Sequence, residues 1–165
     1  ESDLGKGSKF SFDLKFGIVE PALNTEEQQE EKPATKQDYL EGKEILVVED
    51  NKINQMITKK IIEKNKAICR VADNGSTAIE MVREGSFNLI LMDIHMPGIS
   101  GIEATKEIRK FNTEIPIIAL TAVTLDENLD EFYLNGFNDI IPKPYKTEEF
   151  FAKINKYLAK QESKT

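Results

Sequence analysis

The sequence is poor in the residues that build disulfide, zinc or membrane-spanning structures. Its 165 residues include one cysteine, one histidine and no tryptophan. Cys69 alone cannot close an internal disulfide, and one cysteine with one histidine cannot complete a zinc site. No apolar run approaches the ~18 residues that span a bilayer, and the first residues lack the pattern of a signal peptide. We therefore expect a reducing, cytoplasmic compartment, with Cys69 as a small core residue.

The sequence is also short of basic residues. Lysine and arginine total 22 against 29 aspartate and glutamate residues, which gives a net charge of −7 and an isoelectric point near 4.9. Proteins that bind nucleic acid or an anionic membrane surface unaided present a basic face. We therefore expect neither nucleic-acid binding nor direct membrane contact from this chain.

Residues 1–42 differ in composition from the rest of the chain. In residues 10–16 apolar side chains alternate with polar ones, the period-2 pattern of a strand. Residues 20–42 are acidic, rich in glutamine and interrupted by Pro21 and Pro33, a composition typical of a solvated linker. Because one strand is not stable alone, residues 1–19 are either the edge of a domain that lies upstream or a strand that pairs outside this chain. A disordered leader with chance alternation is the remaining alternative.

From residue 43 onward, short apolar segments alternate with segments of helical periodicity. Strands are predicted at residues 44–48, 67–71, 89–93, 115–120 and 139–141. Helices are predicted to begin near residues 53, 75, 100, 124 and 147. Ser100 with Glu103, and Thr124 with Glu127, are capping boxes that start the third and fourth helices. The alternation predicts an α/β fold with a doubly wound, five-stranded parallel sheet of the flavodoxin-like (βα)5 kind. Among the known doubly wound strand orders we choose 2-1-3-4-5.

Polar side chains stand at four of the predicted strand ends, where open α/β sheets place their ligands. These residues are Glu49, Asp50, Asp93, Thr121 and Lys143. Three carboxylates within a few ångströms repel one another, by roughly 4 kcal/mol for each pair ~4 Å apart at an effective dielectric constant near 20. Such a cluster is held together by a raised pKa or by a divalent cation. Mg²⁺ suits it best, because Mg²⁺ accepts one or two carboxylates and keeps sites for water and phosphate oxygens.

The other two groups indicate an anion in the same crevice. The Thr121 hydroxyl and the Lys143 ammonium are hydrogen-bond donors. Together with a metal, they suit a phosphoryl group that is carried by a carboxylate. The set therefore predicts in-line phosphoryl transfer to Asp93, with Mg²⁺ and Lys143 neutralising charge on the phosphoryl oxygens.

Four motifs make the sequence similar to the receiver domains of two-component response regulators. They are Ile45–Asn51 with Asn54 and Gln55, Met92–Pro97 with Gly101, Leu120–Ala122, and Pro142–Pro144. The resemblance covers about residues 43–160, and every motif falls in order at its expected element. It implies a phosphorelay module that takes a phosphoryl group from a phosphohistidine and signals through a conformational change.

The resemblance also implies roles for the acidic residues. Glu49 and Asp50 would form the metal pocket, and Asp93 would be both phosphoacceptor and metal ligand. His95 would lend its backbone carbonyl to the Mg²⁺.

By the same resemblance, Thr121 is the switch hydroxyl, Lys143 pairs with the phosphoryl group, and a cis peptide precedes Pro144. One position departs from the family pattern. A Phe or Tyr usually stands three residues before the lysine, and here that residue is Ile140. We therefore expect a smaller response to phosphorylation, or one carried mainly by residues 121–126.

The spacing of residues 51–55 is most typical of receivers fused to hybrid sensor histidine kinases, and residues 5–16 resemble the end of the ATP-binding domain of those kinases. The expected organisation is a remnant strand of that domain at 1–19, an acidic linker at 20–42, the receiver at 43–160 and a tail at 161–165. The expected partners are a histidine kinase phosphodonor domain, in cis or in a dimer, and a histidine phosphotransfer protein. The kinase activity, and any membrane anchor, would belong to a longer parent protein. This chain alone would catalyse its own phosphorylation and dephosphorylation.

Two other functions remain open at this point. A Mg²⁺-dependent phosphatase of the haloacid dehalogenase kind also uses an aspartate nucleophile, but it needs a second acid two residues later, where this chain has His95. A pseudo-receiver would bind partners without being phosphorylated, although no site residue of the family is missing here.

Overall fold

The computed structural model describes residues 2–3, 7–8, 40–122 and 129–162. The chain divides into two units, 1–35 and 36–165. In the first unit, strands β1 (Ser2–Asp3) and β2 (Gly7–Ser8) pair antiparallel. The strand predicted at residues 10–16, most of the predicted linker and the Thr124–Glu127 capping box lie outside the described residues.

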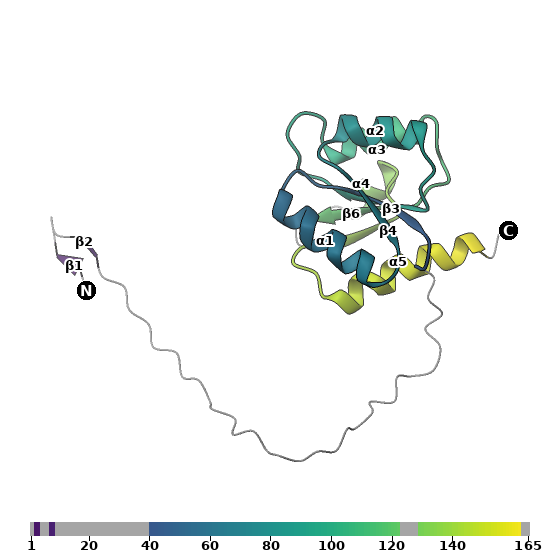
Figure 1. Ribbon diagram of the computed structural model, residues 1–165. Coiled ribbons are helices and arrows are strands. Elements are labelled where there is room, and N and C mark those ends of the chain that lie inside the picture. The colour runs from purple at the N-terminus through teal and green to yellow at the C-terminus, as the bar shows by residue number, and fades with distance from the viewer. Residues whose placement is uncertain (1, 4–6, 9–39, 123–128, 163–165) are drawn as a thin grey trace, which may run out of the picture. The chain divides into compact units, whose positions relative to one another are not determined.

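The second unit is built on a five-stranded parallel sheet (Figure 1). Its strands are β3 (Glu44–Val48), β4 (Ile68–Ala72), β5 (Leu89–Asp93), β6 (Ile117–Thr121) and β7 (Asp139–Pro142). Their order across the sheet is β4-β3-β5-β6-β7. Counted within this unit, that is the predicted order 2-1-3-4-5, and every neighbouring pair is parallel.

Helices cover both faces of this sheet (Figure 1). They are α1 (Lys52–Lys64), α2 (Gly75–Glu84), α3 (Gly101–Arg109), α4 (Leu129–Leu134) and α5 (Thr147–Glu162). Buried side chains of α2 and α3, with Phe132 of α4 against them, pack in one apolar cluster, and those of α1 and α5 pack in another. The unit is therefore the predicted doubly wound three-layer arrangement.

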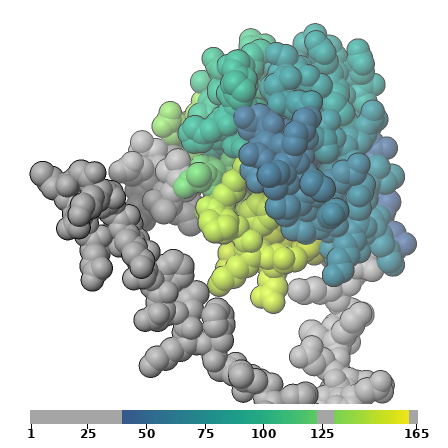
Figure 2. All heavy atoms as spheres, turned by 60° about the vertical axis from the view of Figure 1, so that its left-hand side comes forward, coloured from purple at the N-terminus to yellow at the C-terminus, as the bar shows by residue number. Residues whose placement is uncertain are grey.

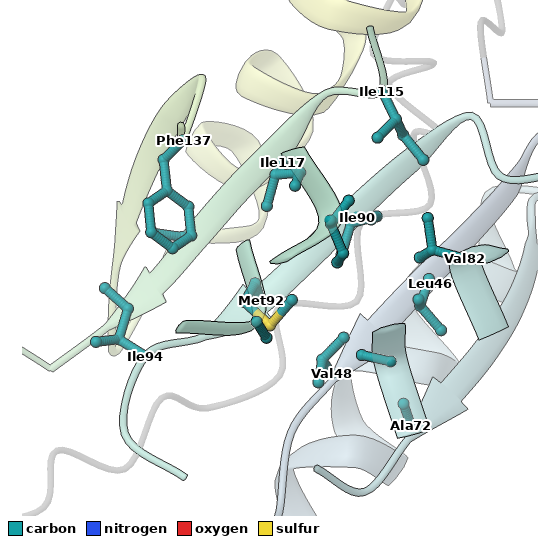
Figure 3. Packing of buried hydrophobic residues seen from close by; sticks show 14 of the residues in the cluster. Leu46, Val48, Ala72, Val82, Ile90, Met92, Ile94, Ile115, Ile117 and Phe137 are labelled. Carbon is teal, nitrogen blue, oxygen red and sulfur yellow. The ribbon is translucent and has the colours of Figure 1, made fainter. Parts of the chain in front are cut away.

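The sheet residues divide between the two clusters by their parity along each strand. In β3, Leu46 and Val48 face the α2–α3 side, whereas Ile45 and Val47 face the α1–α5 side. Figure 3 shows the first of these clusters, with Leu46, Val48, Ile90 and Met92 on adjacent strands. Because both faces are covered, the strands are continuous apolar runs and not alternating ones. Each fully buried Leu, Ile or Val contributes about 1.5–3 kcal/mol to stability.

Side-chain caps begin α1 and α3, and the one at α3 was predicted from the sequence. The Asn51 side chain accepts hydrogen bonds from the backbone N–H groups of Ile53 and Asn54 at the start of α1. Ser100 and Glu103 form the predicted reciprocal capping box of α3. A side-chain acceptor at the N-cap satisfies backbone donors that have no partner within the helix. These caps fix where the loops after β3 and β5 end.

Helix α1 was predicted at the right place, but three of the apolar side chains that recur at helical spacing along it do not face the core. Ile53, Met56 and Ile57 expose 63%, 52% and 50% of their surface. The buried positions of α1 are instead Gln55, Thr58 and Ile62. The helical periodicity therefore indicates the helix correctly, whereas the side that packs on the sheet is mostly polar.

Two further features bear on the predictions from sequence. Cys69 is buried in the α1–α5 cluster, as expected of a small core residue. Leu40 is buried in the same cluster, so packing begins upstream of the expected domain start at residue 43. No helix among the described residues is both long and apolar enough to cross a bilayer.

Candidate active site

The predicted site residues gather at the carboxyl edge of the sheet. Glu49 directly follows β3, Asp93 and Thr121 are the last residues of β5 and β6, and Lys143 directly follows β7. The strands align so that Asp93 pairs with Leu120, the neighbour of Thr121. The topology therefore brings together residues that are up to 94 positions apart in sequence.

Three carboxylates form the acidic part of the site. One carboxylate oxygen from each of Glu49, Asp50 and Asp93 lies within 4.8 Å of the others. Glu49 and Asp93 are buried, with 2% and 7% exposure, whereas Asp50 is exposed. An all-oxygen set with one open side fits Mg²⁺, which prefers carboxylates and retains several water ligands. These residues can hold the predicted metal.

Lys143 lies between the two buried carboxylates. Its Nζ is 2.6 Å from Glu49 Oε2 and 2.7 Å from Asp93 Oδ2. Burial alone would lower the pKa of Lys143, but its hydrogen bonds to Asp93 and Glu49 and their charges raise the pKa above the ordinary value of a lysine. The ammonium therefore stays charged and offsets part of the carboxylate repulsion. The peptide between Lys143 and Pro144 is cis, as the family resemblance implies.

The loop after β5 holds the carboxylate of Asp93 from its other side. Asp93 Oδ1 accepts a hydrogen bond of 3.1 Å from the backbone N–H of His95. The first residue of α3 is Gly101, where an added Cβ would lie 2.0 Å from the carbonyl oxygen of Asp93. Any side chain there would push α3 away from β5. The Gly101 of the family motif is therefore required by close backbone contact.

Thr121 and His95 are placed differently from the acids. Thr121 is buried at the end of β6, and its carbonyl accepts a hydrogen bond of 2.6 Å from the backbone N–H of Lys143. The side chain of His95 is exposed. The roles predicted for the Thr121 hydroxyl and the His95 carbonyl concern a phosphoryl group and a metal, and they remain predictions.

Polar residues at the start of α1 and at its N-cap support Glu49, and no role was predicted for them from the sequence. Asn54 Nδ2 donates to Glu49 Oε1 at 3.0 Å, and the Asn51 N–H donates to the same oxygen at 3.4 Å. Gln55 Nε2 donates to the backbone carbonyl of Glu49 and to Asp73 Oδ1. A sequence signal existed, because residues 51, 54 and 55 share one helix face directly after the acids.

An apolar cavity adjoins the site between α1 and the segment after β7. Its volume is about 430 Å³, and its lining is Glu49, Asn54, Ile57, Ile61, Lys143, Pro144 and Tyr145. Figure 2 shows α1 in blue lying against the yellow β7–α5 segment on this side of the molecule. The exposed side chain of Ile57 on α1 thus lies in the lining of a cavity that reaches Glu49 and Lys143.

Comparisons with known proteins agree with this geometry. Residues 45–155 match the family described as the response regulator receiver domain. The Autoinducer 2 sensor kinase/phosphatase LuxQ of Vibrio vulnificus is 34% identical over 160 residues, which are 96% of this chain and 18% of that protein. The chain thus spans about a fifth of the length of the curated relatives it matches.

Two solved structures are similar over most of the chain. One is the receiver domain of the sensor histidine kinase PA1611 from Pseudomonas aeruginosa, with a magnesium ion coordinated in its active site cleft. Its sequence identity is 32% and its TM-score 0.67, over 72% of this chain and 98% of that one. The other is a co-crystal structure of the Saccharomyces cerevisiae histidine phosphotransfer protein Ypd1 and the receiver domain of Ssk1. The identity there is 34% and the TM-score 0.69, over 74% of this chain and 92% of that one.

Proposed function

The chain belongs to the response regulator receiver domain family, and on this basis we propose that it accepts a phosphoryl group from a phosphohistidine on the carboxylate of Asp93. The observation that carries the proposal is the position of Lys143, whose Nζ lies 2.6–2.7 Å from both Glu49 and Asp93. A charged donor beside a buried carboxylate is suited to pair with the oxygens of a phosphoryl group added there. In the proposed reaction an Asp93 oxygen attacks phosphorus, the P–N bond breaks, and the imidazole nitrogen keeps the electron pair.

The other residues of the site would act on the charge of the transferred group. Lys143 would exchange its hydrogen bond to Asp93 for one to a phosphoryl oxygen, and the Thr121 hydroxyl would donate to a second oxygen. Glu49, Asp50, Asp93 and the His95 carbonyl would hold Mg²⁺, which when bound neutralises charge on the phosphoryl oxygens. The support for Mg²⁺ is the all-oxygen donor set together with the magnesium ion in the similar PA1611 receiver domain.

The partner that donates the phosphoryl group would dock on the exposed face of α1. Ile53, Met56 and Ile57 are each at least half exposed, and Ile57 lines the cavity that reaches Lys143. A helix that carries a phosphohistidine needs an apolar surface next to the acceptor, so that docking places its imidazole over the site. The similar receiver domain of Ssk1 was crystallised with the histidine phosphotransfer protein Ypd1. A histidine phosphotransfer protein or a kinase phosphodonor domain is therefore the proposed partner.

This docking surface has a direct test. Met56→Glu should slow phosphoryl transfer from a phosphorylated histidine phosphotransfer protein at least tenfold, because it places a charge in an apolar contact. The same variant should react normally with phosphoramidate, a small donor that needs no docking surface. Tyr133→Glu changes an exposed apolar residue of α4 and should affect neither rate. Equal slowing with both donors would contradict the assignment of α1 as the docking face.

The longer protein would be a hybrid sensor histidine kinase. In that protein residues 1–19 would end the kinase ATP-binding domain, 20–42 would be the linker, 43–160 the receiver and 161–165 a tail. The support is the 34% identity to LuxQ, which extends over 96% of this chain and so beyond the receiver. The proposal is tested by restoring the upstream sequence and asking whether the longer protein binds ATP.

The conformational response would be small at β7. Ile140, at the usual aromatic position, is buried in the α2–α3 cluster, with Phe132 packed against the same cluster and Phe137 within it. Close packing around Ile140 restricts movement of its side chain. Amide exchange with and without a phosphoryl mimic should change near residues 121–126 more than in α5. Equal protection of the last two helices would contradict this.

The acceptor chemistry is tested by intact mass after incubation with phosphoramidate. The wild type should gain one phosphoryl group only when Mg²⁺ is present, and Asp93→Asn should gain none. Lys143→Met should form the adduct at least tenfold more slowly, because the group that neutralises the transferred charge is lost. Absence of an adduct on a wild type that binds Mg²⁺ would favour the pseudo-receiver alternative.

A further inference from the structure

Helix α1 places a glutamine where a doubly wound fold would normally bury an apolar side chain. Gln55 is 7% exposed and lies on the face of α1 that packs against the sheet, together with Thr58 and Ile62. Burying a primary amide is unfavourable unless its polar atoms are hydrogen-bonded. An apolar side chain at position 55, like that of Ile62 further along the same face, would fill the space without needing hydrogen-bond partners. The position of Gln55 therefore calls for an explanation beyond packing.

The amide nitrogen of Gln55 joins two strand ends. Its Nε2 donates to the backbone carbonyl of Glu49, 2.5 Å away, and to Asp73 Oδ1, 2.8 Å away. Glu49 follows β3, and Asp73 follows β4, the neighbouring strand. Both N–H groups of the amide are thus used, one on each strand end. Asp73 is held in turn by Lys52, whose Nζ lies 2.6 Å from the same oxygen.

The carbonyl that Gln55 holds belongs to the peptide unit between Glu49 and Asp50. The torsions on either side of that peptide, ψ of Glu49 and φ of Asp50, set how the two side chains are oriented relative to each other, and a hydrogen bond to the carbonyl restrains both. The backbone N–H of Glu49 is held separately by the Ala72 carbonyl, at 3.1 Å. That N–H belongs to the preceding peptide, whereas the hydrogen bond from Gln55 restrains the peptide between Glu49 and Asp50. Both carboxylates of the proposed metal pocket depend on its orientation.

From this arrangement we infer that Gln55 is a positioning residue for Mg²⁺: it fixes the Glu49–Asp50 peptide so that the two carboxylates face one ion. The inference rests on the proposed function, in which these residues bind the metal. Mg²⁺ requires near-ideal octahedral geometry at short distances, so it is sensitive to small errors in ligand direction. Groups that orient metal ligands typically change metal affinity 10–100-fold when removed.

The test is calorimetric titration of the full chain with Mg²⁺. Gln55→Met keeps the length of the side chain and its helix propensity but removes both donors, and it should raise the Mg²⁺ Kd about tenfold. Ile62→Val lies on the same buried face without contacting the site, and Lys52→Met removes only the outer partner of Asp73. Both controls should stay within about twofold of the wild type, whatever their unfolding temperatures in EDTA.

Selectivity separates positioning from general loosening of the fold. Ca²⁺ tolerates longer and less regular coordination than Mg²⁺. Gln55→Met should therefore lose more affinity for Mg²⁺ than for Ca²⁺, whereas a merely destabilised variant should lose equally for both. Equal losses, or a Mg²⁺ Kd equal to that of the wild type, would overturn the inference.

A second pair of variants covers the case in which Gln55→Met does not fold. Asp73→Asn removes a charge but keeps an oxygen acceptor for Gln55, whereas Asp73→Ala removes both, and the exposed site tolerates either change. Asp73→Ala should bind Mg²⁺ several-fold more weakly than Asp73→Asn. Equal affinities would contradict a role for the Gln55–Asp73 hydrogen bond in holding the metal pocket. A wild type that binds no Mg²⁺ would instead refute the proposed function, and the inference with it.

Discussion

The three clustered carboxylates should make the protein less stable when no metal is bound. Asp50→Asn removes the exposed member of the cluster and its repulsion with Glu49 and Asp93. Two charges 4.8 Å apart repel by about 3.5 kcal/mol at an effective dielectric constant of 20, and by about 0.9 kcal/mol in bulk water. Asp50 is exposed, so the lower value applies more closely, and attraction to Lys143 offsets part of it. We expect Asp50→Asn to be about 1 kcal/mol more stable than the wild type in EDTA.

Mg²⁺ should remove this advantage. A ligand at ten times its Kd stabilises the folded state by about 1.4 kcal/mol, and one at its Kd by about 0.4 kcal/mol. If the loss of one carboxylate weakens Mg²⁺ about tenfold, the wild type gains about 1 kcal/mol more than Asp50→Asn at the same concentration. The two proteins should then have nearly equal stabilities.

Urea denaturation followed by circular dichroism, in EDTA and in MgCl₂, measures both differences. Glu80→Gln is the control, because it removes one exposed acidic charge from α2, away from the cluster. It should change stability little, and equally in both buffers. Two results would contradict repulsion within the cluster: Asp50→Asn no more stable than the wild type in EDTA, or equal stabilisation of the two proteins by Mg²⁺.

Three further predictions concern groups outside the site. Burial would raise the pKa of Asp139, but hydrogen bonds from Lys153, a backbone N–H and Lys156 lower it below its usual 3.8. The ionised Asp139 therefore stabilises the folded state above about pH 4, and this stabilisation is lost as the pH falls through the lowered pKa. Asp139→Asn should cost about 2 kcal/mol at pH 7 and less at pH 3, measured by urea denaturation at each pH. The buried Thr105 hydroxyl has no hydrogen-bond partner among the described residues, so Thr105→Val should raise the free energy of unfolding by about 1 kcal/mol; a loss of stability would reveal a hidden partner. Burial raises the pKa of Cys69 to about 11, so a disulfide reagent at pH 7 should label it only as fast as the protein opens.

The architecture was predictable because it depends on patterns that are local in sequence. Continuous apolar runs between turn residues indicate strands covered on both faces, and β3 and β5 have this pattern. The site followed from the same step, because parallel strands bring their carboxyl ends to one edge. Lys143 is 94 positions from Glu49, yet the strand pattern alone predicted that they meet.

Helix α1 marks the limit of that reasoning. Periodicity detects that Ile53, Met56 and Ile57 share a face, but it does not say whether the sheet or a partner covers that face. The sheet side instead holds Gln55 and Thr58, because tertiary hydrogen bonds satisfy them. Thr58 Oγ1, for example, lies 2.7 Å from Tyr145 Oη. Such partners lie on other elements of the packed fold, so the helix pattern could mark a shared polar face but not the atoms that face it.

Locating the transferred phosphoryl group decides whether Asp93 is the acceptor. The chain would be phosphorylated with phosphoramidate and Mg²⁺, reduced with borohydride to convert the acyl phosphate into a stable alcohol, and mapped by peptide mass spectrometry. The account predicts one reduced residue, Asp93, and none when Mg²⁺ is omitted. A phosphoryl group found on His95 or on another acid, with Asp93 unmodified, would contradict it.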